Sequence, residues 1–170
     1  MSMQAHSALV SVEDYLNTSY EDGDREFVDG VILERNLGEK DHSIQRELIA
    51  FFGELEQTLK TYSFPEQRVQ VKKTRFRVPD VCVYIGREPE EQVFRTPPFL
   101  VVEILSKDDR ASEMQEKIDD YLAFGVAFVW VIDPRRRIGI IHTAEGSREA
   151  RDGVLRTSNP AIELALDRLF

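Results

Sequence analysis

The sequence predicts an α/β fold with a mixed central β-sheet. Two almost unbroken apolar runs, Phe99–Leu105 and Ala127–Ile132, are typical of strands that are covered on both faces. Between them, Ala111–Phe124 has the apolar spacing of an amphipathic helix. The order strand, helix, strand predicts a right-handed crossover between neighbouring parallel strands. Near the N-terminus, an Asp29-Gly30 pair between apolar residues predicts a β-hairpin.

The N-terminal half carries signals for two helices and three further strand regions. Ser11 and Asp14 have nearly the spacing of a capping box and predict a short helix. The hairpin is expected over 26–33. The segment Asp41–Tyr62 predicts the longest helix, because its apolar residues recur at spacings of three and four. Those apolar residues are Ile44, Leu48, Phe51, Phe52, Leu55 and Leu59. Strands are predicted at Gln67–Lys73 and Val81–Ile85.

In the C-terminal half, Gly125 predicts the end of the crossover helix. Asp133-Pro134 ends the apolar strand that follows. The tail offers two shorter strand candidates, Ile138–His142 and Gly153–Thr157.

Composition favours one soluble, cytoplasmic domain that spans residues 1–170. Hydrophobic residues make up 42% of the chain, which allows a core without disulfides. Cys82 is the only cysteine and lies in an apolar run, so it is expected in the core of a protein from a reducing compartment. There is no apolar run of membrane-spanning length and no signal-peptide pattern at the N-terminus. The net charge of −9 argues against tight, non-specific binding to phosphate backbones.

Two carboxylates are the first candidate site residues. Glu103 is the polar member of an apolar strand, and a buried carboxylate normally pairs, binds a metal or becomes neutral. Asp80 begins the preceding strand. Adjacent strands can bring two carboxylates together, as a hard cation such as Mg²⁺ requires. The alternatives are a strand-end Glu103 that turns to solvent or meets an arginine, and an Asp80 that only forms a turn.

Lys117 is the third candidate. It lies at the edge of the predicted buried face of its helix, one turn before Tyr121, so its amine could reach the sheet. Near two carboxylates and a metal, a lysine can hold an attacking water or stabilise charge on a phosphoryl group. The alternative is a lysine whose stem covers apolar surface while its ammonium stays in water.

Weaker candidates are Glu26, His42 and the charged loop 106–110. Glu26 could supply another acid, or could be a solvated strand-end residue. His42 could contact substrate or support the site, or lie on the surface. The loop could touch substrate or simply be solvated. Nucleotide-binding glycine loops, zinc-type Cys/His spacings and a Gly-x-Ser-x-Gly elbow are absent from the sequence.

In their order and spacing, these residues together resemble the Uma-two family of restriction endonucleases in the PD-(D/E)XK nuclease superfamily. The resemblance covers roughly Ser11 to Phe170. It is carried by Glu26-Phe-Val-Asp-Gly30, His42, Pro79-Asp80-Val81, Val102-Glu103-Ile-Leu-Ser106, Lys117 with Tyr121, Gly125, and Trp130-Val-Ile-Asp133-Pro134. It implies a restriction-endonuclease-like core with an N-terminal hairpin and divalent-metal phosphodiester hydrolysis.

By position, the resemblance implies that Asp80 and Glu103 are metal ligands and that Glu26 is an auxiliary acid. The superfamily's usual lysine would stand at Leu105, and the family's lysine corresponds to Lys117 in the next helix. This sequence has Ser106-Lys107 where relatives often have Ser-Pro. The difference affects the conformation expected of the loop, but not the implied metal ligands.

Three hypotheses follow. The first is an endonuclease that cuts DNA with Mg²⁺ or Mn²⁺, with Asp80, Glu103, Lys117 and Glu26 as its catalytic set and a homodimer as a plausible state. The second is a catalytically weak, nuclease-fold binding or regulatory module, which the acidic charge favours. The third is a structural or toxin-associated protein in which a buried Glu103 pairs with Lys117.

Overall fold

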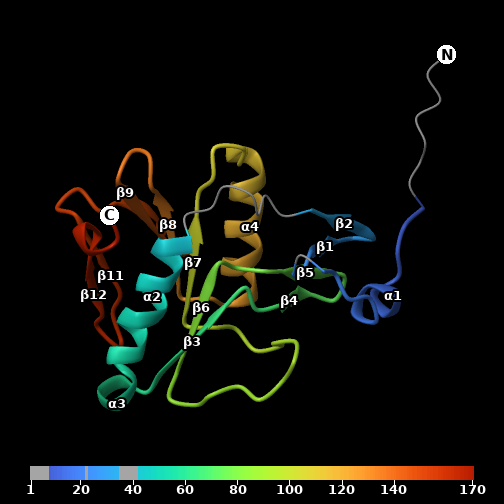
Figure 1. Cartoon of the computed structure of the whole chain (residues 1–170), viewed down its shortest axis with the longest axis horizontal. Coiled ribbons are helices and arrows are strands. Elements are labelled where there is room, and N and C mark those ends of the chain that lie inside the picture. Colours follow the sequence, from blue (N-terminus) through green and yellow to red (C-terminus); the bar gives the residue numbers. More distant parts are fainter. Residues whose placement is uncertain (1–7, 22, 35–41) are drawn as a thin grey trace.

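The main sheet of the computed structural model, which describes residues 8–21, 23–34 and 42–170, is mixed and has six strands (Figure 1). Its strand order is β10-β9-β8-β7-β6-β3. β7 and β8 run parallel, and all other neighbours in this sheet are antiparallel. The bounds are β3 (Thr61–Pro65), β6 (Val81–Ile85), β7 (Leu100–Ile104), β8 (Phe128–Asp133), β9 (Ile138–Thr143) and β10 (Gly146–Glu149). The predicted α/β class, the mixed sheet and the parallel pair are therefore confirmed.

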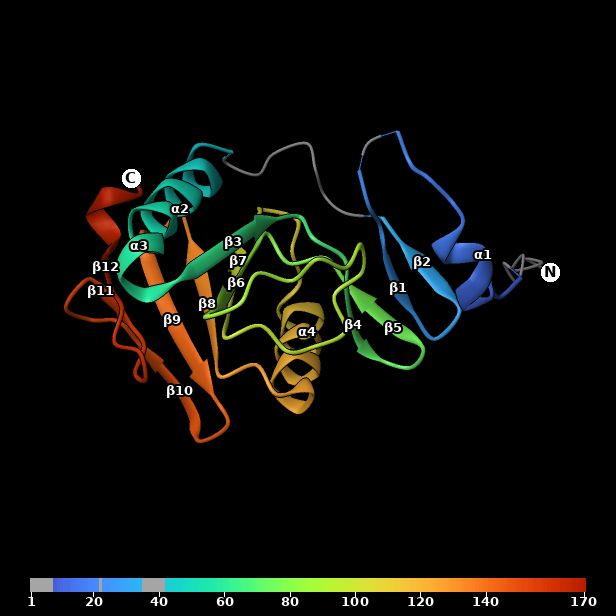
Figure 2. The same cartoon turned by 90° about the horizontal axis from the view of Figure 1, so that it is seen from below.

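Two helices cover opposite faces of this sheet (Figure 2). The helix α4 (Ala111–Phe124) packs Met114, Ile118 and Tyr121 on the face that carries Cys82 and Val101. The helix α2 (His42–Glu54) packs on the other face with the C-terminal segments. Those segments are β11 (Val154–Arg156), β12 (Glu163–Ala165) and the 3-10 turn η1 (Leu166–Arg168). Alternate residues of each strand thus enter two separate cores.

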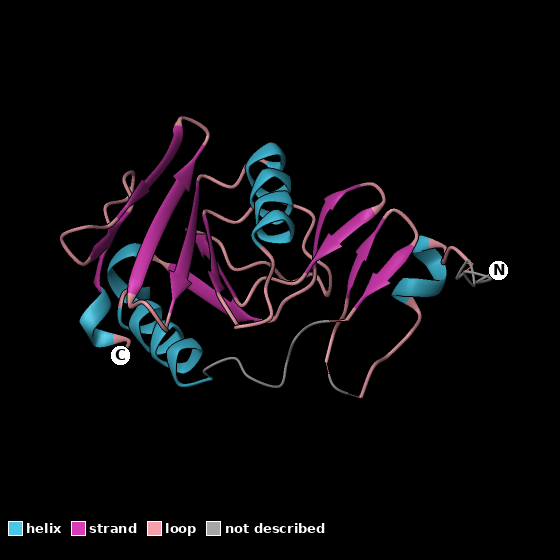
Figure 3. Ribbon diagram, turned by 90° about the horizontal axis from the view of Figure 1, so that it is seen from above, coloured by secondary structure: helices cyan, strands magenta, loops and turns pink. Residues whose placement is uncertain are grey.

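A second, four-stranded sheet was not predicted as a unit. Its order is β2-β1-β5-β4, and its neighbours are antiparallel. The bounds are β1 (Glu26–Val28), β2 (Val31–Leu33), β4 (Val69–Lys72) and β5 (Arg75–Arg77). The helix α4 lies between this small sheet and the main sheet (Figure 3). The short helix α1 (Val12–Leu16) adds Tyr15 to the aromatic core of the small sheet, beside Phe27 and Phe76.

The N-terminal turns follow the sequence signals. Ser11 caps α1, because its hydroxyl accepts a hydrogen bond from the amide of Asp14 at 3.0 Å. Asp29 and Gly30 form the tight turn of the β1–β2 hairpin at φ 49° and 94°. Both values lie in the left-handed region that this two-residue hairpin turn requires.

The predicted helix over Asp41–Tyr62 is too long and needs correction; Asp41 itself lies outside the described residues. The helix α2 ends at Glu54, a short helix α3 (Glu56–Leu59) follows, and β3 begins at Thr61. Lys60 takes a left-handed conformation at φ 52°, which ends the helix. The Thr61 hydroxyl then donates to the Phe52 carbonyl oxygen at 2.6 Å, and β3 pairs with β6. Sheet pairing therefore overrides helical spacing at the end of this segment.

One described feature agrees with a compositional prediction. Cys82 is fully buried, and burial raises the pKa of its thiol, so it is a core residue. Within residues 8–21, 23–34 and 42–170, no helix has both the length and the apolar character needed to cross a membrane.

Replacing Gly125 by Ala is expected to destabilise the protein by about 1 kcal/mol or more. Gly125 ends α4 at φ 113°, and an added Cβ would meet Cγ of Pro97 at 3.1 Å. The matched control is Gly53→Ala in α2, where an added Cβ meets nothing within 4 Å. Since Gly53 lies inside a helix, this control should stabilise by about 0.5–1 kcal/mol. Urea denaturation measures both changes, and equal stability of the two variants would contradict the assignment of Gly125 as the helix cap.

Candidate active site

The two candidate carboxylates come from neighbouring antiparallel strands of the main sheet. Val81 of β6 pairs with Val102 of β7, so the next position in the same register sets Asp80 opposite Glu103. Opposite residues of an antiparallel pair project from the same face. For Glu103 this is the face that α4 covers. The prediction that these strands are neighbours is confirmed, and both side chains are buried.

Each carboxylate is held by a short hydrogen bond. The backbone amide of Ile104 donates to Oδ2 of Asp80 at 2.7 Å. The phenol of Tyr121, on α4, donates to Oε1 of Glu103 at 2.8 Å. Burial and the negative charge of Glu103 raise the pKa of Tyr121 well above its usual value, so the phenol keeps its proton. Glu103 therefore does not turn to solvent, the first alternative that the sequence left open.

Lys117 reaches from α4 towards these acids. Its Nζ lies 3.1 Å from Oε1 of Glu26, and its side chain is 17% exposed. Burial opposes the ammonium charge, but the negative charges of Glu103, Glu26 and Asp80 outweigh it and raise the pKa of Lys117. The ammonium is thus charged at neutral pH and lies within the field of all three carboxylates. Leu105, at the superfamily's usual lysine position, packs in the apolar cluster under α4.

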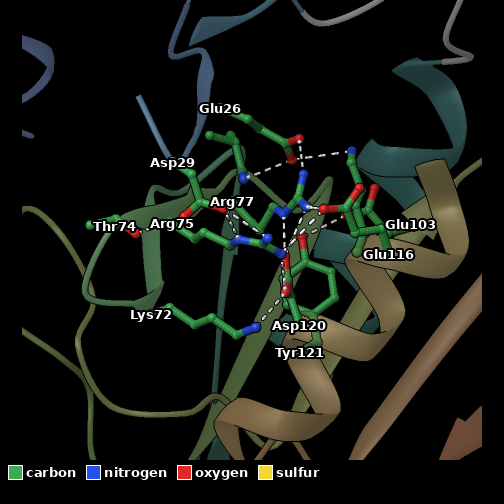
Figure 4. A network of polar contacts seen from close by, with 12 residues as sticks. Glu26, Asp29, Lys72, Thr74, Arg75, Arg77, Glu103, Glu116, Asp120 and Tyr121 are labelled. Atoms are coloured by element: carbon green, nitrogen blue, oxygen red, sulfur yellow. Dashed lines mark hydrogen bonds and ion pairs between the residues drawn. The ribbon is translucent and has the colours of Figure 1, made fainter. Parts of the chain in front are cut away.

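Glu26 is not a solvated strand-end residue, since its side chain is 3% exposed. Its Oε1 accepts from the amide of Val78 at 3.1 Å, and its Oε2 pairs with Nη1 of Arg77 at 3.2 Å. Burial alone would raise the pKa of Glu26, but Lys117 and Arg77 lower it below the usual value. Glu26 is therefore an ionised acid between two cations, in the network that Figure 4 shows.

Arg77 and Asp120 belong to this network, and the sequence analysis missed both. Arg77 Nε and Nη2 lie 2.9 and 2.8 Å from Oδ2 of Asp120 on α4. Asp120 also pairs with Arg75 at 2.9 Å and with Lys72 at 3.5 Å. A signal was present: Asp120 lies on α4 between Lys117 and Tyr121, and an acid at a buried helix position needs a partner.

A pocket of about 370 Å³ opens over Lys117 and Glu26. Its wall includes aliphatic residues of the β1–β2 hairpin, and its rim carries further carboxylates. The residues that line it are Glu26, Val28, Val31, Leu33, Glu34, Arg77, Asp109, Glu113, Glu116 and Lys117. The formal charge of this lining is negative, because five carboxylates face two cationic side chains.

The weaker candidates are placed less centrally. His42 is exposed in the first turn of α2, which covers the other face of the main sheet. In the loop after β7, the amide of Ser106 donates to Oδ2 of Asp109 at 2.8 Å. Asp109 also lines the pocket, so part of this loop borders the site.

Asp80 and Glu103 are the residues that would hold a Mg²⁺ or Mn²⁺ ion. Among the residues that the structure describes, no group of three or more His, Cys, Asp or Glu side chains is arranged to hold a metal ion. Asp80 and Glu103 offer two carboxylates in the same register. Mg²⁺ usually keeps several waters and takes one or two carboxylates together with substrate phosphates.

The structure is a mixed α/β fold with buried acids and a lysine grouped beside α4. The family model that matches residues 12–167 is described as "Uma2: Putative restriction endonuclease". The chain belongs to this family, which confirms the resemblance found in the sequence.

A solved structure shares the fold. It is the crystal structure of a "putative nuclease belonging to DUF820" from Anabaena variabilis. It is similar to this chain at 21% identity and a TM-score of 0.80, over 95% of this chain and 97% of that one. A search of curated proteins gave no match.

Proposed function

We propose that this protein is a metal-dependent endonuclease that hydrolyses phosphodiester bonds in DNA. The observation that carries the proposal is the register that sets Asp80 opposite Glu103 across β6 and β7, with the charge of Lys117 on α4 acting on both acids. Membership of the Uma2 family supports the nuclease class. The buried thiol of Cys82 suits a reducing, cytoplasmic location.

In this proposal Asp80 and Glu103 hold one Mg²⁺ or Mn²⁺. When bound, the ion would lower the pKa of a water and neutralise phosphate charge. The Ile104 amide and the Tyr121 phenol fix the two carboxylates before substrate arrives. The Lys117 ammonium would offset the negative charge that grows on the phosphoryl oxygens. Glu26 holds this ammonium at 3.1 Å.

Cleavage of supercoiled plasmid should require Mg²⁺ or Mn²⁺ and should stop in excess EDTA. The two carboxylates would supply a site for a hard cation, and that cation would activate the attacking water. Restoring the metal after chelation should restore cleavage. Cleavage that persists in excess chelator would contradict the metal-dependent mechanism. His42 would then be the next candidate catalytic residue to test. A duplex has two strands, so linear product would require two copies of the protein or two successive cuts. We include a homodimer in the proposal because it would supply two sites.

The second candidate function is a nuclease-fold binding or regulatory module with weak or no cleavage. The negative lining of the pocket favours it, because carboxylates such as Glu34, Glu113 and Glu116 repel a phosphate backbone. A module of this kind would bind metal or nucleic acid without turnover. Parallel cleavage assays on duplex DNA, single-stranded DNA and RNA, each with a binding measurement, separate the two functions.

A further inference from the structure

Four charged side chains form a ring that joins the small sheet to α4. Lys117 of α4 contacts Glu26 of β1 at 3.1 Å, and Glu26 contacts Arg77 of β5 at 3.2 Å. Arg77 returns to α4 through Asp120 at 2.8 Å. Since Lys117 and Asp120 are three residues apart on one helix, the helix backbone closes the ring.

Three of the four side chains in the ring are buried, and the fourth is only partly exposed. Glu26, Arg77 and Asp120 have side chains that are each 3% exposed, whereas Lys117 is 17% exposed. Two positive and two negative charges balance within it. Buried ion pairs of this kind add little stability over apolar residues, because desolvation offsets their attraction. Fold stability is therefore a poor reason for this arrangement.

The need to place the Lys117 ammonium explains the ring of charged side chains better than fold stability does. A lysine ends in a compact charge on a flexible stem, so it needs a fixed partner to keep one position. Glu26 is that partner, and both of its oxygens are engaged by Lys117, Arg77 and the Val78 amide. Arg77 in turn is fixed by two contacts to Asp120. The ring therefore assigns Glu26 to the lysine.

We propose that Arg77 and Asp120 are positioning residues that act through Glu26 to hold the Lys117 ammonium at the reacting phosphate. In this scheme Asp120 touches neither metal nor substrate, and Arg77, which is 3% exposed at the pocket wall, acts through its contact with Glu26. The catalytic consequence rests on the proposed nuclease function, but the placement of Lys117 does not.

The test is a double-mutant cycle between Asp120→Asn and Lys117→Met. In the otherwise unchanged protein, D120N should lower the plasmid cleavage rate by about tenfold, the lower end for changes that support a site indirectly. The KM for plasmid should stay unchanged. In the K117M background, D120N should change the rate by less than about twofold, because the residue through which it acts is gone. A tenfold loss in both backgrounds would overturn the proposal.

Asp119→Asn is the matched control, since it makes the same chemical change at the neighbouring, exposed position of α4. It should leave the cleavage rate unchanged. If D120N does not fold, Arg77→Lys replaces D120N in the cycle. The lysine keeps the positive charge but cannot make both of the contacts that Arg77 makes to Asp120. In the K117M background, R77K should likewise change the rate by less than about twofold.

A second readout needs no nuclease activity. Acetic anhydride labelling at one fixed pH, followed by mass spectrometry, compares Lys117 with the exposed Lys73. D120N should raise the labelling of Lys117 relative to Lys73 by at least about threefold, and D119N should not. Unchanged labelling of Lys117 in D120N would overturn the proposal that Asp120 positions Lys117. Changed labelling in a protein that never cleaves would uphold the ring and reject the nuclease function.

Discussion

Glu103→Gln is expected to remove Mn²⁺ binding and to lower DNA cleavage by more than about 10²-fold. The change keeps the size of the side chain and its ability to accept from Tyr121, but it removes the negative charge that a hard cation requires. Losing a residue that merely supports a ligand costs about 10–100-fold, so losing the ligand itself should cost more. Isothermal titration with Mn²⁺ and plasmid cleavage measure the two effects.

Two control variants sharpen this prediction. Tyr121→Phe keeps Glu103 and removes the 2.8 Å hydrogen bond to it. The DNA cleavage rate of this variant should therefore fall by about 10–100-fold. Glu88→Gln makes the same chemical change on an exposed loop that does not line the pocket at Lys117, and it should have no effect. Mn²⁺ binding that survives Glu103→Gln with unchanged affinity would show that the cation, if one binds, is held elsewhere.

Lys117→Met is expected to reduce turnover by about 10²-fold or more while metal affinity stays the same or rises. The substitution keeps most of the stem and removes the charge, so it separates chemistry from packing. A preorganised charge near a phosphoryl group serves the transition state more than the ground state. Removing a cation beside Asp80 and Glu103 also removes a charge that repels the metal. The measurements are kcat for plasmid cleavage and the Mn²⁺ dissociation constant.

Lys73→Met provides the matched control, because Lys73 is exposed and should tolerate the same change without loss of turnover. Lys117→Ala should behave like Lys117→Met. Full activity in Lys117→Met would mean that the lysine only covers apolar surface. Lys107, in the loop after β7, would then be the next residue to test.

The strongest sequence signals were the local ones. The Asp29-Gly30 turn, the end of α4 at Gly125 and the parallel pair β7–β8 are all confirmed. The turn and the helix end depend on residues that are close in sequence, whose conformational limits are severe. The parallel pair follows from the order strand, helix, strand. The neighbouring strands of Asp80 and Glu103 were also predictable, because apolar runs separated by a short connection tend to pair.

The small sheet and its ion pairs could not be predicted in the same way. The turn predicted β1 and β2 as a hairpin, but β5, which joins them to β4, has only three residues, which is too short for a period of two to stand out. Glu26 and Arg77 are 51 residues apart, and no local pattern connects them. The roles of Asp80, Glu103, Lys117 and Glu26 remain proposals, although their burial and spatial grouping are now known.

A crystal of the protein soaked in Mn²⁺ tests the central claim most directly, by the anomalous difference density of the metal. We predict one strong peak between the carboxylates of Asp80 and Glu103, within coordination distance of both, and no peak there in Glu103→Gln. Tyr121 should still contact Glu103 in the soaked crystal. A peak only at the rim carboxylates Glu113 or Glu116, or no peak at all, would contradict the account.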